Sequence, residues 1–129
     1  MAQAVLEHIT ITVSDLARTA AMLADLFGWK VRWQDPPGGS IHGGTSWHVG
    51  GDETYLAIYT QGSNLPPPDS YKTPGAANHI GVVVDDLDAV EAKVIAAGFE
   101  PHSHADYEPG RRFYFNDADG IEIEVVSYT

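Results

Sequence analysis

The feature that most constrains the fold of this chain is an internal repeat. The segment HITITVSDL, which begins at His8, recurs as HIGVVVDDL from His79, with His, Ile, Val, Asp and Leu at matching places. Each copy alternates apolar with other residues and then reaches an acidic residue, the pattern of a strand followed by the N-terminal cap of a helix. The chain is therefore expected to contain two similar units.

Each copy is expected to continue as one helix and three strands. The first helix should begin near Asp15 and stop at Gly28, and the second should begin near Asp86 and stop at Gly98, because both segments carry apolar residues at helical spacing. Strand-like sequence follows at 29–34, 45–49 and 54–60 in the first copy, and at 99–104, 112–116 and 121–128 in the second. The proline-containing stretch 61–78 is expected to be a linker.

This order of elements predicts an α+β fold. Two tandem βαβββ modules are expected to form a cupped, mostly antiparallel sheet around a central cavity, because neither half could cover its own sheet face alone. The 129 residues suit a single domain over 1–129, with module one at about 4–60, the linker at about 61–78 and module two at about 79–128.

Charge and composition exclude several classes of protein. The chain has 7 basic and 18 acidic residues, a formal net charge of −11, which disfavours binding to nucleic acids and to anionic membranes. No apolar run approaches the roughly 20 residues that span a bilayer, and the N-terminus lacks the pattern of a signal peptide. With no cysteine, any metal site must use histidine and carboxylate. We therefore expect a soluble, cytoplasmic protein.

Strand alternation predicts which side chains share the face opposite the apolar one. On that face His8, His79 and Glu124 are expected to form a site for a divalent metal with open positions for substrate or water. Each histidine alone is more simply an ordinary surface residue, but its recurrence at the same strand position favours a ligand. The same face is expected to hold Thr10, Tyr59, Arg112, Tyr114 and Glu122.

The repeated motif H-I-x-[IV]-x-V-x-D-L, together with FYFNDADGIEIEV at 113–125, resembles the vicinal oxygen chelate superfamily. This group includes glyoxalase I, extradiol dioxygenases, fosfomycin-resistance thiol transferases and bleomycin-binding proteins. The resemblance implies paired βαβββ modules around a metal, commonly in a dimer. By motif position it implies that His8, His79 and Glu124 are the metal ligands. The fourth family position, a Glu or Gln, falls at Ala57, which cannot ligate a metal.

The expected function is that of a metal-dependent enzyme acting on a small oxygenated substrate, as an isomerase, lyase or dioxygenase. The ion would act as a Lewis acid, and open positions favour Fe(II) or Mn(II), with Ni or Zn as alternatives. Glu124, Tyr114 and Glu122 are the candidate catalytic residues, with Glu122 as a proton shuttle. The candidate substrate-binding residues are Thr10, Tyr59, Arg112 and Trp47.

Two other functions remain open at this stage. One is a non-catalytic small-molecule binding protein of the bleomycin-resistance kind, and its relatives generally lack the metal ligands. The other is a fosfomycin-type thiol transferase, for which few basic residues are present besides Arg112 and Arg111 to hold a phosphonate. In each case the expected partners are a small molecule and a second copy of the chain in a homodimer.

Overall fold

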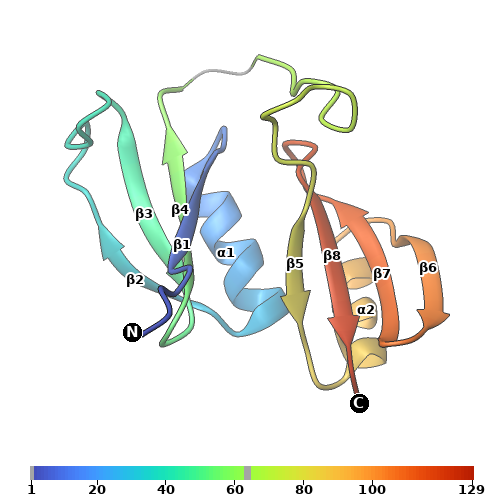
Figure 1. Ribbon diagram of the computed structural model, residues 1–129. Helices are drawn as coiled ribbons and strands as arrows, with labels where there is room; N and C mark the ends of the chain where they lie inside the picture. The colour runs from blue at the N-terminus through green and yellow to red at the C-terminus, as the bar shows by residue number, and fades with distance from the viewer. Residues whose placement is uncertain (1, 63–64) are drawn as a thin grey trace. The chain divides into compact units, whose positions relative to one another are not determined.

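The computed structural model describes residues 2–62 and 65–129, and the chain divides into two compact units, Met1–Asn64 and Leu65–Thr129. Unit 1 contains β1 (His8–Thr12), α1 (Leu16–Phe27), β2 (Lys30–Gln34), β3 (Thr45–Gly50) and β4 (Tyr55–Thr60). Unit 2 contains β5 (Ile80–Val83), α2 (Leu87–Ala96), β6 (His102–Tyr107), β7 (Gly110–Asn116) and β8 (Glu122–Ser127). The α+β class and the order βαβββ in each unit are confirmed (Figure 1).

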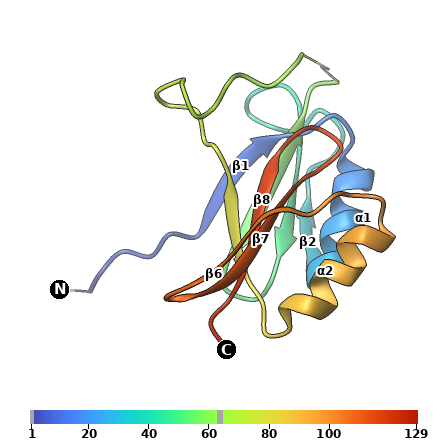
Figure 2. The ribbon, with the colours of Figure 1, turned by 90° about the vertical axis from the view of Figure 1, so that its right-hand side faces the viewer.

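The two units have the same sheet topology. Each holds an open four-stranded sheet, in the order β1-β4-β3-β2 in unit 1 and β5-β8-β7-β6 in unit 2. The first strand of each unit pairs in parallel with the last, and the other pairings are antiparallel. The helix of each unit packs on one face of its own sheet, as Figure 2 shows for α2 beside β7 and β8.

Both helices begin where the sequence predicts. The side chains of Asp15 and Asp86 accept hydrogen bonds of 3.0 Å from the backbone N–H groups three residues later, which caps the two N-termini. Gly28 ends α1 in the left-handed conformation, with φ at 71°, as glycine at this position commonly does. In α2 the cap is Ala97, and the left-handed glycine Gly98 follows it.

The core of each unit lies between its helix and the apolar face of its sheet, as alternation predicts. The most deeply buried side chains are Leu23, Val49 and Ile58 in unit 1 and Val94, Phe113, Phe115 and Val125 in unit 2. Ile9 is an exception, because alternation places it on the apolar face with Ile11, whereas it is 44% exposed. Within the described residues α1 contacts β2, β3 and β4 but not the edge strand β1, so this end of the apolar face stays open.

The prediction for the strand after α2 is wrong in its bounds. The strand runs from His102 to Tyr107 instead of over 99–104, because Phe99 packs on Phe115 as the chain leaves the helix. Near its start the pairing with β7 shifts, and Ser103 adopts a positive φ of 56°. This irregularity interrupts the alternation of side chains along β6. Neither helix in the described part of the chain combines the length and the apolar character needed to cross a membrane.

Candidate functional site

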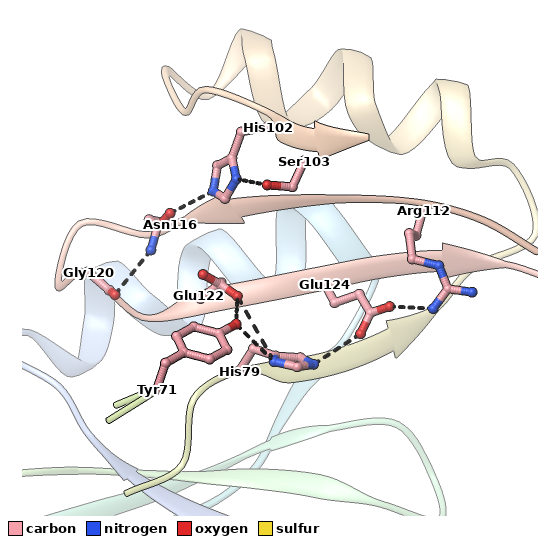
Figure 3. A network of polar contacts seen from close by, with 9 residues as sticks. All are labelled: Tyr71, His79, His102, Ser103, Arg112, Asn116, Gly120, Glu122 and Glu124. Carbon is pink, nitrogen blue, oxygen red and sulfur yellow. Dashed lines mark hydrogen bonds and ion pairs between the residues drawn. The ribbon is translucent and has the colours of Figure 1, made fainter. Parts of the chain in front are cut away.

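The densest polar cluster of unit 2 lies on the sheet face that points away from α2, and Figure 3 shows His79, Arg112, Glu122 and Glu124 from it. We call it the C-terminal face and define it by His79, Arg112, Tyr114, Glu122 and Glu124. Their sharing of a face follows from the register, since Glu124 on β8 pairs with Tyr114 on β7 and with Gly81 on β5. The alternation predicted from sequence therefore brings these five residues together.

The centre of this face is a contact between a histidine and a carboxylate. His79 Nε2 lies 3.1 Å from Glu124 Oε1, and the side chains are 30% and 12% exposed, respectively. Gly81 stands opposite Glu124 in the sheet, and a Cβ added there would lie 4.0 Å from Oε1. The missing side chain at Gly81 thus leaves the space beside the carboxylate uncrowded.

Arg112 holds the other oxygen of the same carboxylate. Its Nη1 donates a hydrogen bond of 2.8 Å to Glu124 Oε2, and its guanidinium carbon lies 4.9 Å from the ring centre of Tyr107. Burial lowers the pKa of Arg112, but the hydrogen bond to Glu124 and nearby negative groups outweigh this effect and leave the pKa raised. Arg112 is therefore a fixed positive charge that orients Glu124.

The second nitrogen of His79 faces another acidic group. Nδ1 lies 3.4 Å from the hydroxyl of Tyr71 and 4.0 Å from Glu122 Oε1. Tyr71 donates a hydrogen bond to Glu122, and this bond, with burial and the charge of Glu122, raises the pKa of Tyr71 to about 12. Tyr114 meets the His79 ring edge-on, with centres 5.6 Å apart, and burial raises its pKa, so its phenol is neutral at pH 7.

The pair of His79 and Glu124 fits part of a divalent metal site. Two ligand atoms at about 2.1 Å from one ion and about 90° apart are separated by about 3 Å, close to the 3.1 Å between Nε2 and Oε1. A carboxylate near the other nitrogen of a ligand histidine, where Glu122 lies, is also a usual feature of metal sites. Within each unit's described residues, no group of three or more His, Asp or Glu side chains could hold a metal. The geometry of the pair is thus compatible with two ligands of such a site and with no third one in unit 2 among the described residues.

His8 lies in unit 1, on the sheet face that points away from α1. We call this surface the N-terminal face and define it by His8, Arg32, Trp33, His48 and Tyr55. The ring of Tyr55 stacks on both imidazoles, with centres 4.8 Å from His8 and 4.4 Å from His48. Trp33 lies 5.1 Å from His48, and Arg32 lies over Tyr55 at 4.7 Å. The face is therefore built from stacked rings.

A carboxylate in contact with these rings is that of Glu7, beside the start of β1. Its Oε1 lies 2.9 Å from His8 Nδ1 and accepts a hydrogen bond of 3.1 Å from the hydroxyl of Tyr55. These hydrogen bonds lower the pKa of Glu7. Burial, followed by the charge of His8, lowers the pKa of His48, which is neutral at pH 7.

The remaining candidate residues divide between the two sides of the unit 1 sheet. Thr10 pairs with Ala57, and Tyr59 lies two residues further along β4, so both share the face of His8. The hydroxyl of Tyr59 donates a hydrogen bond of 3.1 Å to the backbone oxygen of His42. Trp47 pairs with the buried Ile58 and lies on the opposite side, toward the core. The register thus separates Trp47 from Thr10 and Tyr59.

Ala57 occupies the position in unit 1 that Glu124 occupies in unit 2. The pairing of Thr10 with Ala57 matches that of Gly81 with Glu124, with the partner strands parallel in both cases. Ala57 is 4% exposed, so this position is both apolar and buried. Unit 1 therefore offers His8 without the carboxylate that accompanies His79.

Sequence reasoning missed two features of the C-terminal face. Tyr71 comes from the stretch expected to be only a linker, which has no periodic pattern to indicate a contact with Glu122. Regular alternation in the strand predicted at 99–104 would put His102 and His104 on one side, but in the structure they point to opposite sides. His102 Nε2 lies 2.8 Å from Asn116 Oδ1, whereas His104 contacts Glu91 of α2. The positive φ at the intervening serine has no signal in the sequence.

Known proteins share this fold over nearly the whole chain. The structure resembles a glyoxalase/bleomycin resistance protein/dioxygenase domain from Frankia sp. EAN1pec, with a TM-score of 0.79 and 19% identity over 98% of this chain and 93% of that one. It also resembles TnmS3, an antibiotic binding protein from Streptomyces sp. CB03234, with a TM-score of 0.75 and 22% identity over 100% and 99% of the two chains.

A third similar structure is the fosfomycin resistance protein FosX from Listeria monocytogenes, with a TM-score of 0.72 and 21% identity over 99% of this chain and 96% of that one. At these identities the three structures establish the fold alone. No curated protein sequence matches the chain.

The sequence itself identifies the family. Residues 5–125 match the family model described as Glyoxalase/Bleomycin resistance protein/Dioxygenase superfamily, and this span contains both copies of the repeat and the residues of both faces. The resemblance inferred from the motifs is confirmed, and the chain belongs to the glyoxalase/bleomycin resistance protein/dioxygenase superfamily.

Proposed function

We propose that this protein is a divalent-metal-dependent enzyme that acts on a small oxygenated substrate, as an isomerase, lyase or dioxygenase. The observation that carries the proposal is the 3.1 Å contact between His79 Nε2 and Glu124 Oε1, with a further group orienting each side chain. Proteins of this superfamily bind small molecules and generally use a divalent metal. His8 is proposed as the third ligand on the basis of the repeat alone.

In this proposal the residues of the C-terminal face have distinct tasks. A bound Fe(II) or Mn(II), with Ni or Zn as alternatives, would act as a Lewis acid toward the substrate oxygens. Arg112 fixes the direction of the Glu124 carboxylate through the 2.8 Å hydrogen bond. Tyr114, whose phenol is neutral, can donate a proton or a hydrogen bond at the edge of the His79 ring.

Glu122 can be assigned one of two roles. Its carboxylate lies near Nδ1 of His79 and accepts from Tyr71, so we propose that it orients the imidazole and keeps the proton on Nδ1. The sequence-based alternative is proton transfer to or from the substrate. Replacing Glu122 with Gln separates the two, since lost orientation lowers metal affinity whereas lost proton transfer lowers the turnover rate at unchanged metal content.

The test of the proposal is the metal content of protein purified without chelators or an affinity tag, measured by mass spectrometry. We expect about one Fe, Mn, Ni or Zn ion per chain, and its loss in His79→Ala and Glu124→Gln. His102→Ala is the matched control, because His102 belongs to the same unit and is already paired with Asn116. The same measurement on His8→Ala tests the third ligand.

A wild-type protein that is purified without metal, and that binds none of Fe, Mn, Ni or Zn when they are added, would contradict the proposal. Circular dichroism of each variant distinguishes the loss of a ligand from the loss of the fold.

A second candidate function is the binding and sequestration of a small molecule without catalysis. It is favoured by Ala57, which removes a potential ligand from unit 1, and by the ring-rich N-terminal face, which suits contact with an apolar or aromatic molecule. TnmS3, which is similar in fold, is an antibiotic binding protein. A fosfomycin-type thiol transferase is a further alternative, and the fosfomycin resistance protein FosX is similar in fold. Turnover assays on metal-loaded protein distinguish these functions.

We also propose that residues 1–129 act as a single domain, that the protein forms a homodimer and that it works in the cytoplasm. The dimer is common in the family, and the absence of cysteine suits a reducing compartment. Sedimentation equilibrium tests the dimer, and cell fractionation tests the compartment. A single cooperative unfolding transition is expected for one domain, and two separated transitions would contradict it.

A further inference from the structure

Arg112 has hydrogen-bonding capacity that the protein does not use. Its side chain is only 13% exposed, and its Nη1 is bound to Glu124. The other two nitrogens, Nε and Nη2, are buried and have no hydrogen-bond partner among the described residues. Buried donors in native proteins are nearly always paired, so these two nitrogens indicate that an acceptor from outside the chain binds here.

The positions of the unpaired nitrogens within the guanidinium define the shape of that acceptor. Nε–H and one N–H of Nη2 lie along one edge of the planar group and point in nearly the same direction. Such an edge matches two oxygens on one atom, as in a carboxylate, and binds them through two parallel hydrogen bonds. Glu124 occupies only Nη1, so this edge is not used by the protein.

Charge favours an acceptor with a single negative charge. Arg112 is already neutralised by Glu124, and Glu122 adds a further negative charge on the same face. The chain as a whole has a net charge of −11. A monoanionic carboxylate adds less repulsion here than a phosphate or phosphonate, which carries up to two charges near neutral pH.

The ring of Tyr107 lies over the guanidinium, 4.9 Å from its carbon atom, and is itself 59% exposed. An aromatic ring on one face of an arginine shields that face and does not use the hydrogen-bonding edges. Because Tyr107 is at the exposed end of β6, its side chain can move without disturbing the core. Tyr107 therefore provides a movable cover next to the edge.

From these observations we propose that the Nε/Nη2 edge of Arg112 binds the carboxylate of the substrate, which makes the substrates small organic monocarboxylates. This inference rests on the proposed function in that it names the substrate class of the same site. The carboxylate would lie beside Glu124, held by an arginine that also fixes that residue. Arg112 is thus a residue that determines specificity.

The test observes the arginine Nε–H resonances of the full-length protein by NMR during addition of sodium acetate at constant ionic strength. The chain has four arginines, and the Arg112 resonance is assigned by its absence from Arg112→Lys. We expect a saturable shift of this resonance with acetate and an affinity for inorganic phosphate about tenfold weaker. Chloride alone should not produce the shift.

Two variants sharpen this experiment. Arg112→Lys keeps the positive charge beside Glu124 but lacks the planar edge, so acetate binding should weaken at least about tenfold. Arg111→Lys is the matched control, because Arg111 is the adjacent residue and pairs at the surface with Asp88 at 3.2 Å. It should bind acetate as the wild type does.

Three results would overturn the inference: an Arg112 resonance that responds equally to acetate and chloride, acetate binding that is unchanged in Arg112→Lys, or tighter binding of phosphate than of acetate. The experiment is run on protein as purified and again with a chelator, so it does not depend on metal. Acetate binding by a protein that never binds metal would support this inference and contradict the proposed metal-dependent enzyme. Metal binding by a protein that does not bind acetate would contradict this inference and leave the proposed enzyme supported.

Discussion

The N-terminal face and the C-terminal face occupy equivalent positions on sheets of the same topology, yet their chemistry differs. In unit 1, His8 stacks on Tyr55, and the buried position next along β4 on this face is Ala57. In unit 2, His79 lies between two glutamates, with Glu124 at the position equivalent to Ala57. A repeated backbone thus fixes the positions of side chains, while a few substitutions decide whether a face is ionic or aromatic.

The contacts that hold the two histidines in place also differ. His8 is oriented by ring stacking and by one exposed carboxylate, that of Glu7. His79 is oriented by largely buried groups on both of its nitrogens. Removing one partner of a buried ionic contact leaves the other charge unpaired and costs much stability. Stacked rings instead stabilise the protein through several weaker contacts, so the loss of one contact costs less. Substitutions at equivalent positions should therefore have different effects in the two units.

The largest effect on the free energy of unfolding is expected when the glutamate of the C-terminal face is introduced at the equivalent position of the N-terminal face. Ala57→Glu places a carboxylate at a buried position where the facing residue, His48, is neutral at pH 7. In a chelating buffer we expect the free energy of unfolding, measured with urea, to fall by about 3 kcal/mol, because the new charge has no partner. Thr10→Glu, at the exposed neighbouring position, should change it by about 0.5 kcal/mol or less.

Adding Mn(II) extends this experiment. The new carboxylate would stand to His8 as Glu124 stands to His79, so metal binding should restore part of the lost stability by mass action. A variant as stable as the wild type in chelator would contradict the view that position 57 is a dry, unpartnered site. A destabilised variant that Mn(II) does not rescue would contradict the equivalence of the two histidines.

The next effect concerns the ring at the centre of the aromatic face. Tyr55→Ala removes two stacked contacts, with His8 and His48, and should lower the free energy of unfolding by about 2 kcal/mol, at about 1 kcal/mol for each pair. Tyr55→Phe keeps the ring and loses only the exposed hydrogen bond to Glu7, so it should remain close to the wild type. Equal losses in both variants would show that the hydroxyl, and not the stacking, stabilises this face.

A smaller effect is expected from pH. The pKa of His48 lies below its usual value of 6.5, mainly because of burial and next because of His8. Below about pH 6.5 the unfolded chain therefore takes up a proton more readily than the folded chain, and the free energy of unfolding falls as the pH falls through the folded pKa. NMR titration of the His48 ring should give a midpoint below 6.5. His48→Gln should remove this part of the pH dependence, and a midpoint above 6.5 would contradict the burial argument.

Much of this comparison could be predicted from sequence because it depends on local patterns. The acidic caps at Asp15 and Asp86 determine where the helices begin, and alternation along β8 puts Glu122 and Glu124 on one face. The same alternation assigns Trp47 to the side of Val49, which is fully buried, so its placement toward the core was available from the sequence. The repeat also predicts that His8 and His79 occupy equivalent positions in the two units.

Other parts depend on contacts or backbone geometry that no local pattern encodes. Tyr71 reaches Glu122 from a segment without regular structure, so only the tertiary fold brings the two together. The positive φ of Ser103 reverses the side-chain alternation in β6, although serine does not usually indicate such a conformation. The unpaired edge of Arg112 likewise depends on which of its nitrogens Glu124 occupies.

The smallest effect concerns the residue beside Glu124. Gly81 has no left-handed φ, and an added Cβ would be 4.0 Å from Glu124 Oε1, an ordinary contact. Gly81→Ala should therefore raise the free energy of unfolding by about 0.5 kcal/mol, by restricting the unfolded chain, and leave the metal content unchanged. Gly28→Ala is the control with the opposite sign, because its φ of 71° is strained for alanine. If Gly81→Ala destabilises the protein or reduces its metal content, the space beside Glu124 is needed by the site, and the absence of a side chain there is functional.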